Sequence, residues 1–195
     1  MAYAVIKRGS SGKGWFAIAK EDPPFFISVR QFAAWDLHEN QELDEAEYRR
    51  ILGLKRRDDC QEKALSLLAV REHTERELKE KLLARKFSSA QIDEVLVQLR
   101  EDGSLDEARY AESMIRSRQS RNPEGKALLL ERLVAKGVPR EEAAKAVNAA
   151  FAEHGEAYLR VAFENVGRTT PDRNKQIQKL LRKGFSYRDV KRLFS

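Results

Sequence analysis

One short phrase of apolar, basic and turn-forming residues occurs three times in this chain of 195 residues. The copies are Leu82–Ser88 (LLARKFS), Leu133–Pro139 (LVAKGVP) and Leu180–Ser186 (LLRKGFS). If Phe87, Val138 and Phe185 are equivalent, the copies lie 51 and 47 residues apart. A repeat at a nearly constant period indicates an array of similar units rather than a chain folded around one central core.

Each copy has the pattern of a helix, a tight turn and a second helix. An apolar face ends in a basic residue, a Gly or Lys follows, and a helix-capping residue comes shortly afterwards. In the first copy, Leu78 and Leu82 belong to one apolar stripe, and Ile92, Val95 and Leu99 to another. The sequence predicts a mainly α fold, in which an elongated tandem array of three-helix repeats follows a small α+β module.

The first part of the chain follows a different rhythm. Tyr3–Arg8 and Trp15–Lys20 are β-prone segments joined by a connection rich in Gly and Ser, which predicts a hairpin. Phe25–Ile27 can form a third strand. Capping patterns at Ser28 and Asp44 predict the starts of two helices. These features predict the α+β module.

The aromatic residues of this module allow two interpretations. Their rings can stack on nucleic-acid bases, with Lys13 of the hairpin loop near a phosphate. They can also fill the core, and we favour this role because a module of this size needs its large apolar side chains inside. The residues concerned are Trp15, Phe16, Phe25, Phe26, Trp35 and Tyr48.

The expected units are residues 1–54 for the α+β module and 55–103, 104–154 and 155–195 for the three repeats. We interpret the charged segment Lys55–Asp59 as a hinge or linker. Because each unit has a modest core, long helices are expected to bridge neighbouring units.

Helix starts are expected at several capping residues. Thr74 and Ser88 fit this role in the first repeat, and Ser104 with Glu107 opens the second. Asn122–Pro123 and Thr170–Pro171 are expected to begin later helices.

Composition narrows the class of protein. The net charge of +6 favours polyanionic partners such as nucleic acid. No apolar stretch is long enough for a bilayer, and the first residues lack the order of a signal peptide. The single cysteine, Cys60, is typical of a reducing compartment. We therefore expect a cytoplasmic protein without membrane association.

The sequence offers no set of residues for catalysis or metal binding. His38, His73 and His154 have no ligand-type residue at a metal-binding spacing. No phosphate-binding loop, dinucleotide fingerprint or nucleophile elbow occurs. We expect no enzyme activity, catalytic residue, metal, cofactor or small-molecule substrate, so that binding carries the function.

Basic residues gather near the end of the chain. Lys175, Lys179 and Arg182 recur at helical spacing, opposite Ile177 and Leu180. An ordinary solvated helix face explains a single stripe equally well. Stripes on several successive repeats would favour a polyanion-binding surface.

Five sets of residues share a recognisable pattern: Leu105–Ala111; the cations Arg116 and Arg118; Gly125 with Leu129–Val138; the positions Arg71, Thr74, Glu77–Leu78 and Lys81–Leu82; and Lys179–Phe185. In this order and spacing they resemble the RecX family of regulators of the bacterial RecA recombinase. The resemblance covers roughly Ala64 to the C-terminus. Two departures are Arg85–Phe87 in place of a Lys-Gly-Phe type of sequence, and Thr74 in place of a commoner serine, which preserves a helix cap. The N-terminal module lies outside the shared pattern.

The resemblance implies a noncatalytic protein that lies in the groove of the RecA–DNA filament. It implies regulation, most simply inhibition, of the ATPase, strand-exchange and co-protease activities of RecA in recombination and DNA repair. The implied partners are the RecA filament and single- or double-stranded DNA, and we expect the protein to be a monomer.

The resemblance and the charge pattern together select thirteen candidate contact residues. Those in the first two repeats are Arg71, Arg109, Arg116, Arg118, Lys126, Arg132 and Lys136. Those in the third are Arg168, Arg173, Lys175, Lys179, Arg182 and Lys183. For each residue, a helix cap or an ion pair within the chain is the alternative. Asp106 and Tyr110 are expected to be structural.

Two other classes of function fit the same sequence. A helical DNA-binding protein would act on bare DNA independently of RecA. A protein–protein adaptor built as a helical array would need neither DNA nor the basic stripe.

Overall fold

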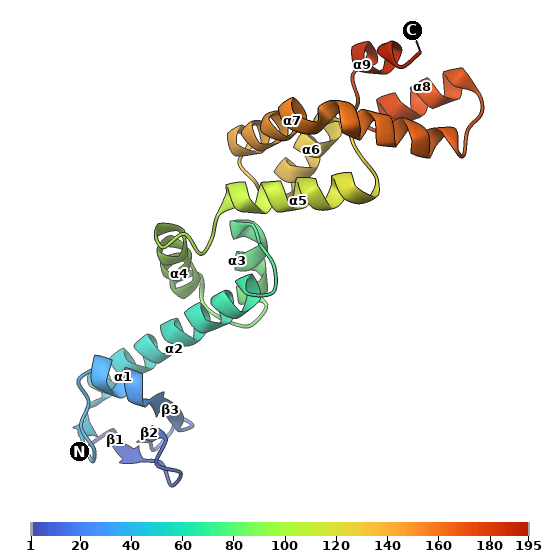
Figure 1. The fold of residues 1–195 in the computed structure, drawn as a ribbon. Helices are drawn as coiled ribbons and strands as arrows, with labels where there is room; N and C mark the ends of the chain where they lie inside the picture. The colour runs from blue at the N-terminus through green and yellow to red at the C-terminus, as the bar shows by residue number, and fades with distance from the viewer. Residues whose placement is uncertain (1, 195) are drawn as a thin grey trace.

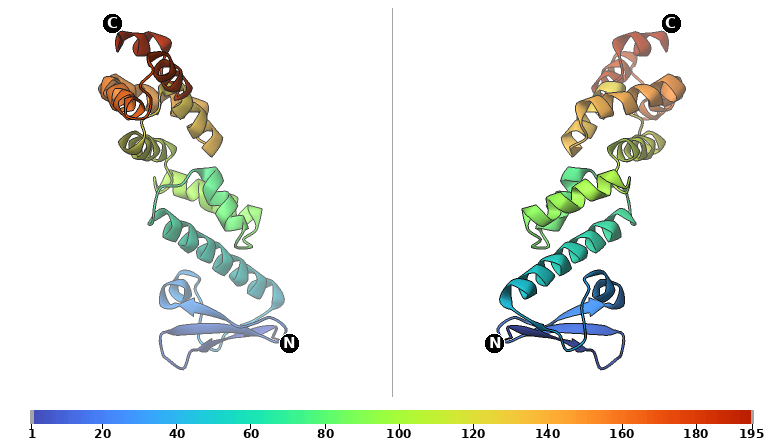
Figure 2. Two further views of the ribbon diagram at one scale, coloured as in Figure 1. Left: turned by 90° about the vertical axis from the view of Figure 1, so that its right-hand side faces the viewer. Right: turned by 90° about the vertical axis from the view of Figure 1, so that its left-hand side faces the viewer.

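The computed structural model describes residues 2–194 as an elongated array of helices that begins with a small sheet (Figure 1). The sheet and the last helices lie at opposite ends of the molecule (Figure 2). The mainly α fold with a small N-terminal α+β module is confirmed.

The N-terminal module contains an antiparallel sheet with the strand order β3-β2-β1-β4. Its strands are β1 (Ala4–Arg8), β2 (Gly14–Ala19), β3 (Phe25–Ser28) and β4 (Glu42–Leu43). Helix α1 (Val29–Ala34) follows β3 directly, because the Ser28 hydroxyl oxygen accepts the Gln31 N–H. The hairpin, the third strand and this cap are confirmed, whereas β4 was not predicted.

The core of the module lies on one face of the sheet. Ile6, Ala17 and Ile27 point there and pack under Tyr48 and Ile51 of the next helix. The ring of Trp15 stacks on Phe32 of α1, with 3.7 Å between the ring centroids. Core packing is therefore confirmed for Trp15, Phe25, Trp35 and Tyr48.

Phe16 and Phe26 contradict the expectation that all six aromatic residues fill the core. Side chains alternate between the two faces of a strand. Phe26 stands between Phe25 and Ile27, which face the core, and it therefore lies on the opposite face with 40% of its surface exposed. Phe16 is paired with Phe26 across β2 and β3 and shares that face.

Helix α2 (Glu45–Leu68) runs without a break from the N-terminal module into the first repeat. The expectation of a hinge at Lys55–Asp59 is therefore wrong. The charged side chains in this segment hold the helix instead of interrupting it, since Lys55 pairs with Asp59 one turn later at 2.5 Å. Arg57 also reaches across to Gln98 (3.1 Å).

The first repeat consists of the second half of α2 with α3 (Glu75–Leu83) and α4 (Ser89–Glu101). Thr74 and Ser88 accept hydrogen bonds from the N–H groups three residues later, so both predicted caps are confirmed. The core contains Cys60, Leu78, Leu82, Ile92 and Leu96.

The second repeat consists of α5 (Glu107–Arg121), α6 (Lys126–Lys136) and the first half of α7 (Arg140–Gly167). Its predicted helix starts need correction. Asp106, rather than Ser104, caps α5, because its carboxylate accepts the N–H groups of Ala108 (2.8 Å) and Arg109 (3.1 Å). Helix α6 begins after Gly125 rather than at Asn122–Pro123. Two hydrogen bonds between the Gln119 side chain and the backbone of Glu124 hold the connection in a non-helical turn.

The third repeat consists of the second half of α7 with α8 (Arg173–Arg182) and α9 (Tyr187–Arg192). Asp172 caps α8 through the Lys175 N–H (2.8 Å), so this helix does not begin at Thr170–Pro171. Helices α2 and α7 each contribute to two hydrophobic cores, as expected for bridging helices. The limits of the units remain a prediction, because α2 and α7 run across two of them and Leu105, just after the third, packs in the core of the first repeat.

The third repeat docks on the second through direct contact between two backbone turns. The Gly125 N–H donates to the Lys183 carbonyl (2.7 Å). A methyl group on Gly125 would overlap the backbone of Gly184 and Phe185. Gly184 itself has φ +87°, a conformation that disfavours other residues. The turn between α5 and α6 therefore fixes the position of the turn after α8.

This contact predicts a selective effect of one methyl group. Gly125→Ala should lower the free energy of unfolding by about 1–3 kcal/mol, because the backbones must move apart. Gly53→Ala is the matched control, since a Cβ at this helical position meets nothing within 4 Å. The control should stabilise the protein by about 0.5–1 kcal/mol. Urea denaturation measures both, and equal effects would contradict the proposed contact.

Candidate partner interface

Five of the predicted contact residues in the first two repeats form ion pairs with acidic side chains of the chain itself. These residues are Arg71, Arg109, Arg118, Arg132 and Lys136. For these five residues, the structure contains an ion pair within the chain, which is the alternative to a partner contact that the sequence left open. Their charges are at least partly neutralised before any partner binds.

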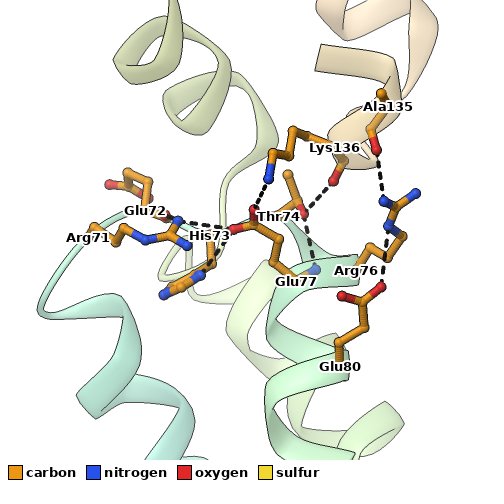
Figure 3. A network of polar contacts seen from close by, with 9 residues as sticks. All are labelled: Arg71, Glu72, His73, Thr74, Arg76, Glu77, Glu80, Ala135 and Lys136. Atoms are coloured by element: carbon orange, nitrogen blue, oxygen red, sulfur yellow. Dashed lines mark hydrogen bonds and ion pairs between the residues drawn. The ribbon is translucent and has the colours of Figure 1, made fainter. Parts of the chain in front are cut away.

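Glu77 is the centre of the polar network between the first two repeats (Figure 3). Its carboxylate accepts hydrogen bonds from Arg71 (3.0 Å) and from Lys136 (3.3 Å), which belongs to the end of α6. The ring of His73 lies 3.3 Å from the same carboxylate. The Thr74 hydroxyl, which caps α3, donates to the Lys136 carbonyl (2.9 Å). This carboxylate therefore connects α3 to α6.

Electrostatics favour the ionised form of Glu77. Burial alone would raise the pKa of its carboxyl group, but hydrogen bonds from Arg71 and Lys136 and the charge of Arg71 outweigh burial and lower the pKa. Burial is the main cause that lowers the pKa of His73, which favours the neutral ring.

Other contacts join the same two repeats. Arg76 donates to the Ala135 carbonyl (2.7 Å), and Arg109 pairs with Glu72 (2.5 Å). Glu107 of α5 accepts the backbone N–H of Glu75 at the start of α3 (2.9 Å). These polar contacts connect two hydrophobic cores that have no residue in common.

Arg118 and Arg132 converge on one acidic residue, Glu124. Their distances to its carboxylate are 3.5 and 2.8 Å, and only 6% of the Glu124 side chain is exposed. A buried carboxylate requires such partners. Both arginines therefore stabilise the turn between α5 and α6. Lys126 contacts Asn148 (3.2 Å) and lies 5.6 Å from the ring centroid of Phe151.

The predicted residues of the third repeat have a different environment. Arg173 donates to the Phe194 carbonyl and lies over its ring. Lys179 donates to the Thr170 hydroxyl (2.5 Å), and Lys183 donates to the Asn122 side chain. The acceptors in these three hydrogen bonds carry no negative charge. Within residues 2–194, we find no ion pair or side-chain hydrogen bond for Arg116, Arg168, Lys175 and Arg182, which are all exposed.

Three of these cations line a hollow of about 410 Å³ between the end of α5, the end of α7 and α8. Its lining residues are Asn122, Asn165, Val166, Thr169, Lys179, Arg182 and Lys183. None of them is acidic. Burial lowers the pKa of Lys183, while the charge of nearby Glu124 opposes this shift. The hollow combines three cationic donors with amide and hydroxyl groups, a donor set suited to a phosphate or carboxylate.

The sequence predicted the cations of the hollow but not the uncharged residues that line it, which are Asn122, Asn165, Val166 and Thr169. Asn122 and Lys183 are 61 positions apart and meet because the two glycine turns dock. Asn165 lies in the last turn of α7 and Thr169 two residues after its end, and neither belongs to the apolar periodicity from which the sequence predicts this helix. The recurrent Gly in the repeated phrase was the available signal for the docking.

The rest of the described chain contains no arrangement suited to metal or thiol chemistry. Among residues 2–194, no group of three His, Cys, Asp or Glu side chains is placed to hold a metal ion. Burial raises the pKa of the Cys60 thiol to about 11, so the thiol stays protonated. In the same residues, no helix has both the length and the apolar character that a membrane span requires.

Two family models match the repeats. The one described as "RecX, first three-helix domain" matches residues 60–99, and "RecX, second three-helix domain" matches residues 106–147. The regulatory protein RecX of Chlorobium limicola is 33% identical over 135 residues, which cover 66% of this chain and 82% of that protein. The regulatory protein RecX of Finegoldia magna is 27% identical over 177 residues, or 87% and 86% of the two chains.

The chain spans about half the length of other curated relatives. For the regulatory protein RecX of Chlorobium phaeobacteroides, identity is 41% over 75 residues, which are 38% of this chain and 50% of that protein.

Solved structures share the fold. A crystal structure of a regulatory protein RecX superposes with a TM-score of 0.77 at 20% identity and covers 98% of both chains. RecX from Lactobacillus salivarius gives a TM-score of 0.64 at 23% identity, over 72% of this chain and 96% of that one.

The network around Glu77 predicts a stability that depends on pH. Because the folded state lowers the pKa of this carboxyl group, its contribution is complete above the ordinary glutamate pKa and is lost as pH falls through the lowered value. Glu77→Gln should cost about 1–3 kcal/mol near pH 7, because charged donors lose their acceptor. The difference from the parent protein should shrink in acid.

Glu80→Gln is the control for this variant. Its carboxylate is 66% exposed and pairs with Arg76 at 3.5 Å. This change should alter stability by less than about 1 kcal/mol at any pH. Denaturation curves from pH 3 to pH 8 make the comparison, and a constant cost of the Glu77 variant over this range would refute the assignment.

Proposed function

The chain belongs to the RecX family of regulatory proteins, and from this premise we propose that it regulates the RecA recombinase by binding the RecA–DNA filament. The observation that carries the proposal is the cationic hollow at α8, where Lys179, Arg182 and Lys183 have no acidic partner among its lining residues. A phosphate of filament-bound DNA, or a carboxylate on the surface of RecA, would supply the negative charge that the hollow lacks.

The elongated shape supports a filament as the partner. Successive units of an extended array can contact successive positions along a groove, and many weak contacts then add up to useful affinity. Lys175 and Arg182 are exposed and can meet such a surface without first breaking an internal ion pair.

We propose inhibition as the outcome. A protein that binds one state of an assembly more tightly than another shifts the assembly toward that state. The state of the RecA–DNA filament that this protein stabilises would have lower ATPase, strand-exchange and co-protease activity.

A DNA-binding protein that acts independently of RecA is the second candidate. The same hollow favours this function, because three cations and neutral amides can bind a phosphate of bare DNA as well as a phosphate of filament-bound DNA. Its binding would weaken steeply as salt concentration rises.

A titration separates these functions. ATP hydrolysis by RecA on single-stranded DNA should fall as the protein is added, at concentrations too low to coat the DNA. Fluorescence anisotropy on DNA alone gives the coating concentration. Suppression only at that concentration would favour the second candidate. An unchanged rate would contradict filament regulation and leave the adaptor function.

Charge reversal tests the surface itself. Lys175→Glu with Arg182→Glu should raise the concentration needed for half-suppression by about tenfold, since two attractive contacts become repulsive. Arg50→Glu with Arg56→Glu is a matched control on α2, because both arginines are exposed and have no side-chain partner within residues 2–194. Equal increases in the half-suppression concentration for the two double variants would show that only net charge matters. This result would contradict a specific binding surface at α8.

A further inference from the structure

The face of the N-terminal sheet opposite the core has no helix over it in the described part of the chain. Both α1 and the start of α2 pack on the other face, through Phe32, Tyr48 and Ile51. In Figures 1 and 2 the sheet forms the end of the molecule, with the helices on one side of it. Among its apolar residues, Ile18 is 41% and Phe26 is 40% exposed.

Strand pairing arranges this outer face in rows. Phe26, Phe16 and Lys7 are paired across β3, β2 and β1, so they form one row of two aromatic rings and a cation. The two rings meet edge to face, with 5.5 Å between centroids. The next row consists of Ile18, Val5 and Glu42.

Two glycines make room for the rings. A methyl group on Gly9 would lie 3.1 Å from the Phe16 ring, and one on Gly14 would lie 2.6 Å from the Phe26 ring. The hairpin backbone therefore lies directly beside both aromatic side chains. Packing against the hairpin backbone therefore fixes the position of both rings on the surface, while 40% of Phe26 remains exposed.

The charge of the hairpin is one-sided. The first twenty residues of the chain contain Lys7, Arg8, Lys13 and Lys20 but no acidic residue. Lys7 donates to the neutral side chain of Asn40 (3.0 Å). Glu42, paired with Val5, is the acidic residue on the strands of this face and lies outside the aromatic row. A polyanion therefore fits this end of the sheet.

We propose that this outer face binds single-stranded nucleic acid, with bases against Phe16 and Phe26 and phosphates near Lys7 and Lys13. Exposed aromatic rings beside cations are the combination that binds single strands, because unpaired bases present flat apolar faces and the backbone carries negative charge. A duplex keeps these base faces stacked inside. The site lies outside residues 60–147, where the family models match, and binding here does not depend on RecA.

Substitutions of Phe26 test stacking without disturbing the core. Phe26→Leu keeps an apolar side chain but removes the ring, and Phe26→Tyr keeps the ring. Anisotropy with a fluorescein-labelled oligothymidylate of about 12 nucleotides should show a loss of affinity of about fivefold to a hundredfold for leucine and little change for tyrosine. Val29→Ala, at an apolar position of α1 that is 59% exposed, should bind like the parent protein.

To distinguish binding at this site from binding at the α8 surface, the anisotropy measurement is repeated in a protein that also carries Lys175→Glu and Arg182→Glu. The effect of Phe26→Leu should keep the same size, because distant sites act independently. Oligothymidylate carrying 5-iodouracil should also photo-crosslink within residues 14–28. Unchanged RecA regulation by the α8 variant, together with intact crosslinking, would contradict the proposed function of the α8 surface and leave this proposal standing.

Several outcomes would overturn the nucleic-acid assignment. One is equal affinity of the parent protein and Phe26→Leu, and another is crosslinking only outside the N-terminal module. If Phe26→Leu instead abolishes self-association in sedimentation experiments while oligonucleotide binding persists, a second copy covers the face. If it weakens only the effect on RecA, the occupant is a protein surface.

Discussion

The arrangement of the two halves of this chain depends on the carboxylate of Glu77. The N-terminal module shares α2 with the first repeat, and the second repeat shares α7 with the third, so both of these junctions are rigid helices. Within residues 2–194, no helix is shared between the first and second repeats. Thr74 and Glu77 on one side meet Lys136 on the other, and this polar contact replaces a common core. Because such bonds need good geometry, they fix one relative orientation more narrowly than apolar contact would.

Internal ion pairs explain why the sequence alone does not identify partner contacts among the basic residues of the first two repeats. Glu124 binds Arg118 and Arg132 from two helices, and these arginines neutralise a charge that the fold has buried. Removing either would leave that carboxylate short of a partner, so a loss of activity in such a variant would not identify a partner contact. Exposed cations without acidic partners, such as Lys175 and Arg182, do not have this ambiguity.

Local patterns were sufficient for much of the fold. The caps at Ser28, Thr74 and Ser88 depend on residues three positions apart, and the predicted side-chain bonds are present. Some failures arose where distant parts of the chain decide. Asn122–Pro123 has the local signature of a helix start, but Gln119 holds Glu124 in a turn and Gly125 contacts the turn after α8, so the helix starts three residues later. A charged segment read as a hinge became the middle of α2, because Asp58 and Arg57 find partners on α1 and α4.

The candidate sites show the same limit. The cations near the C-terminus were visible as a stripe, but the neutral side chains that complete the hollow come from helices whose approach no local pattern specifies. In the N-terminal module, alternation along β3 was sufficient to place Phe25 and Ile27 on one face and Phe26 on the other. The six aromatic residues therefore do not form one group, since Phe25 packs against the core and Phe26 is exposed. A strand in a two-layer module can bury only one of its faces, so adjacent aromatic residues must differ in role, and the exposed one requires its own explanation.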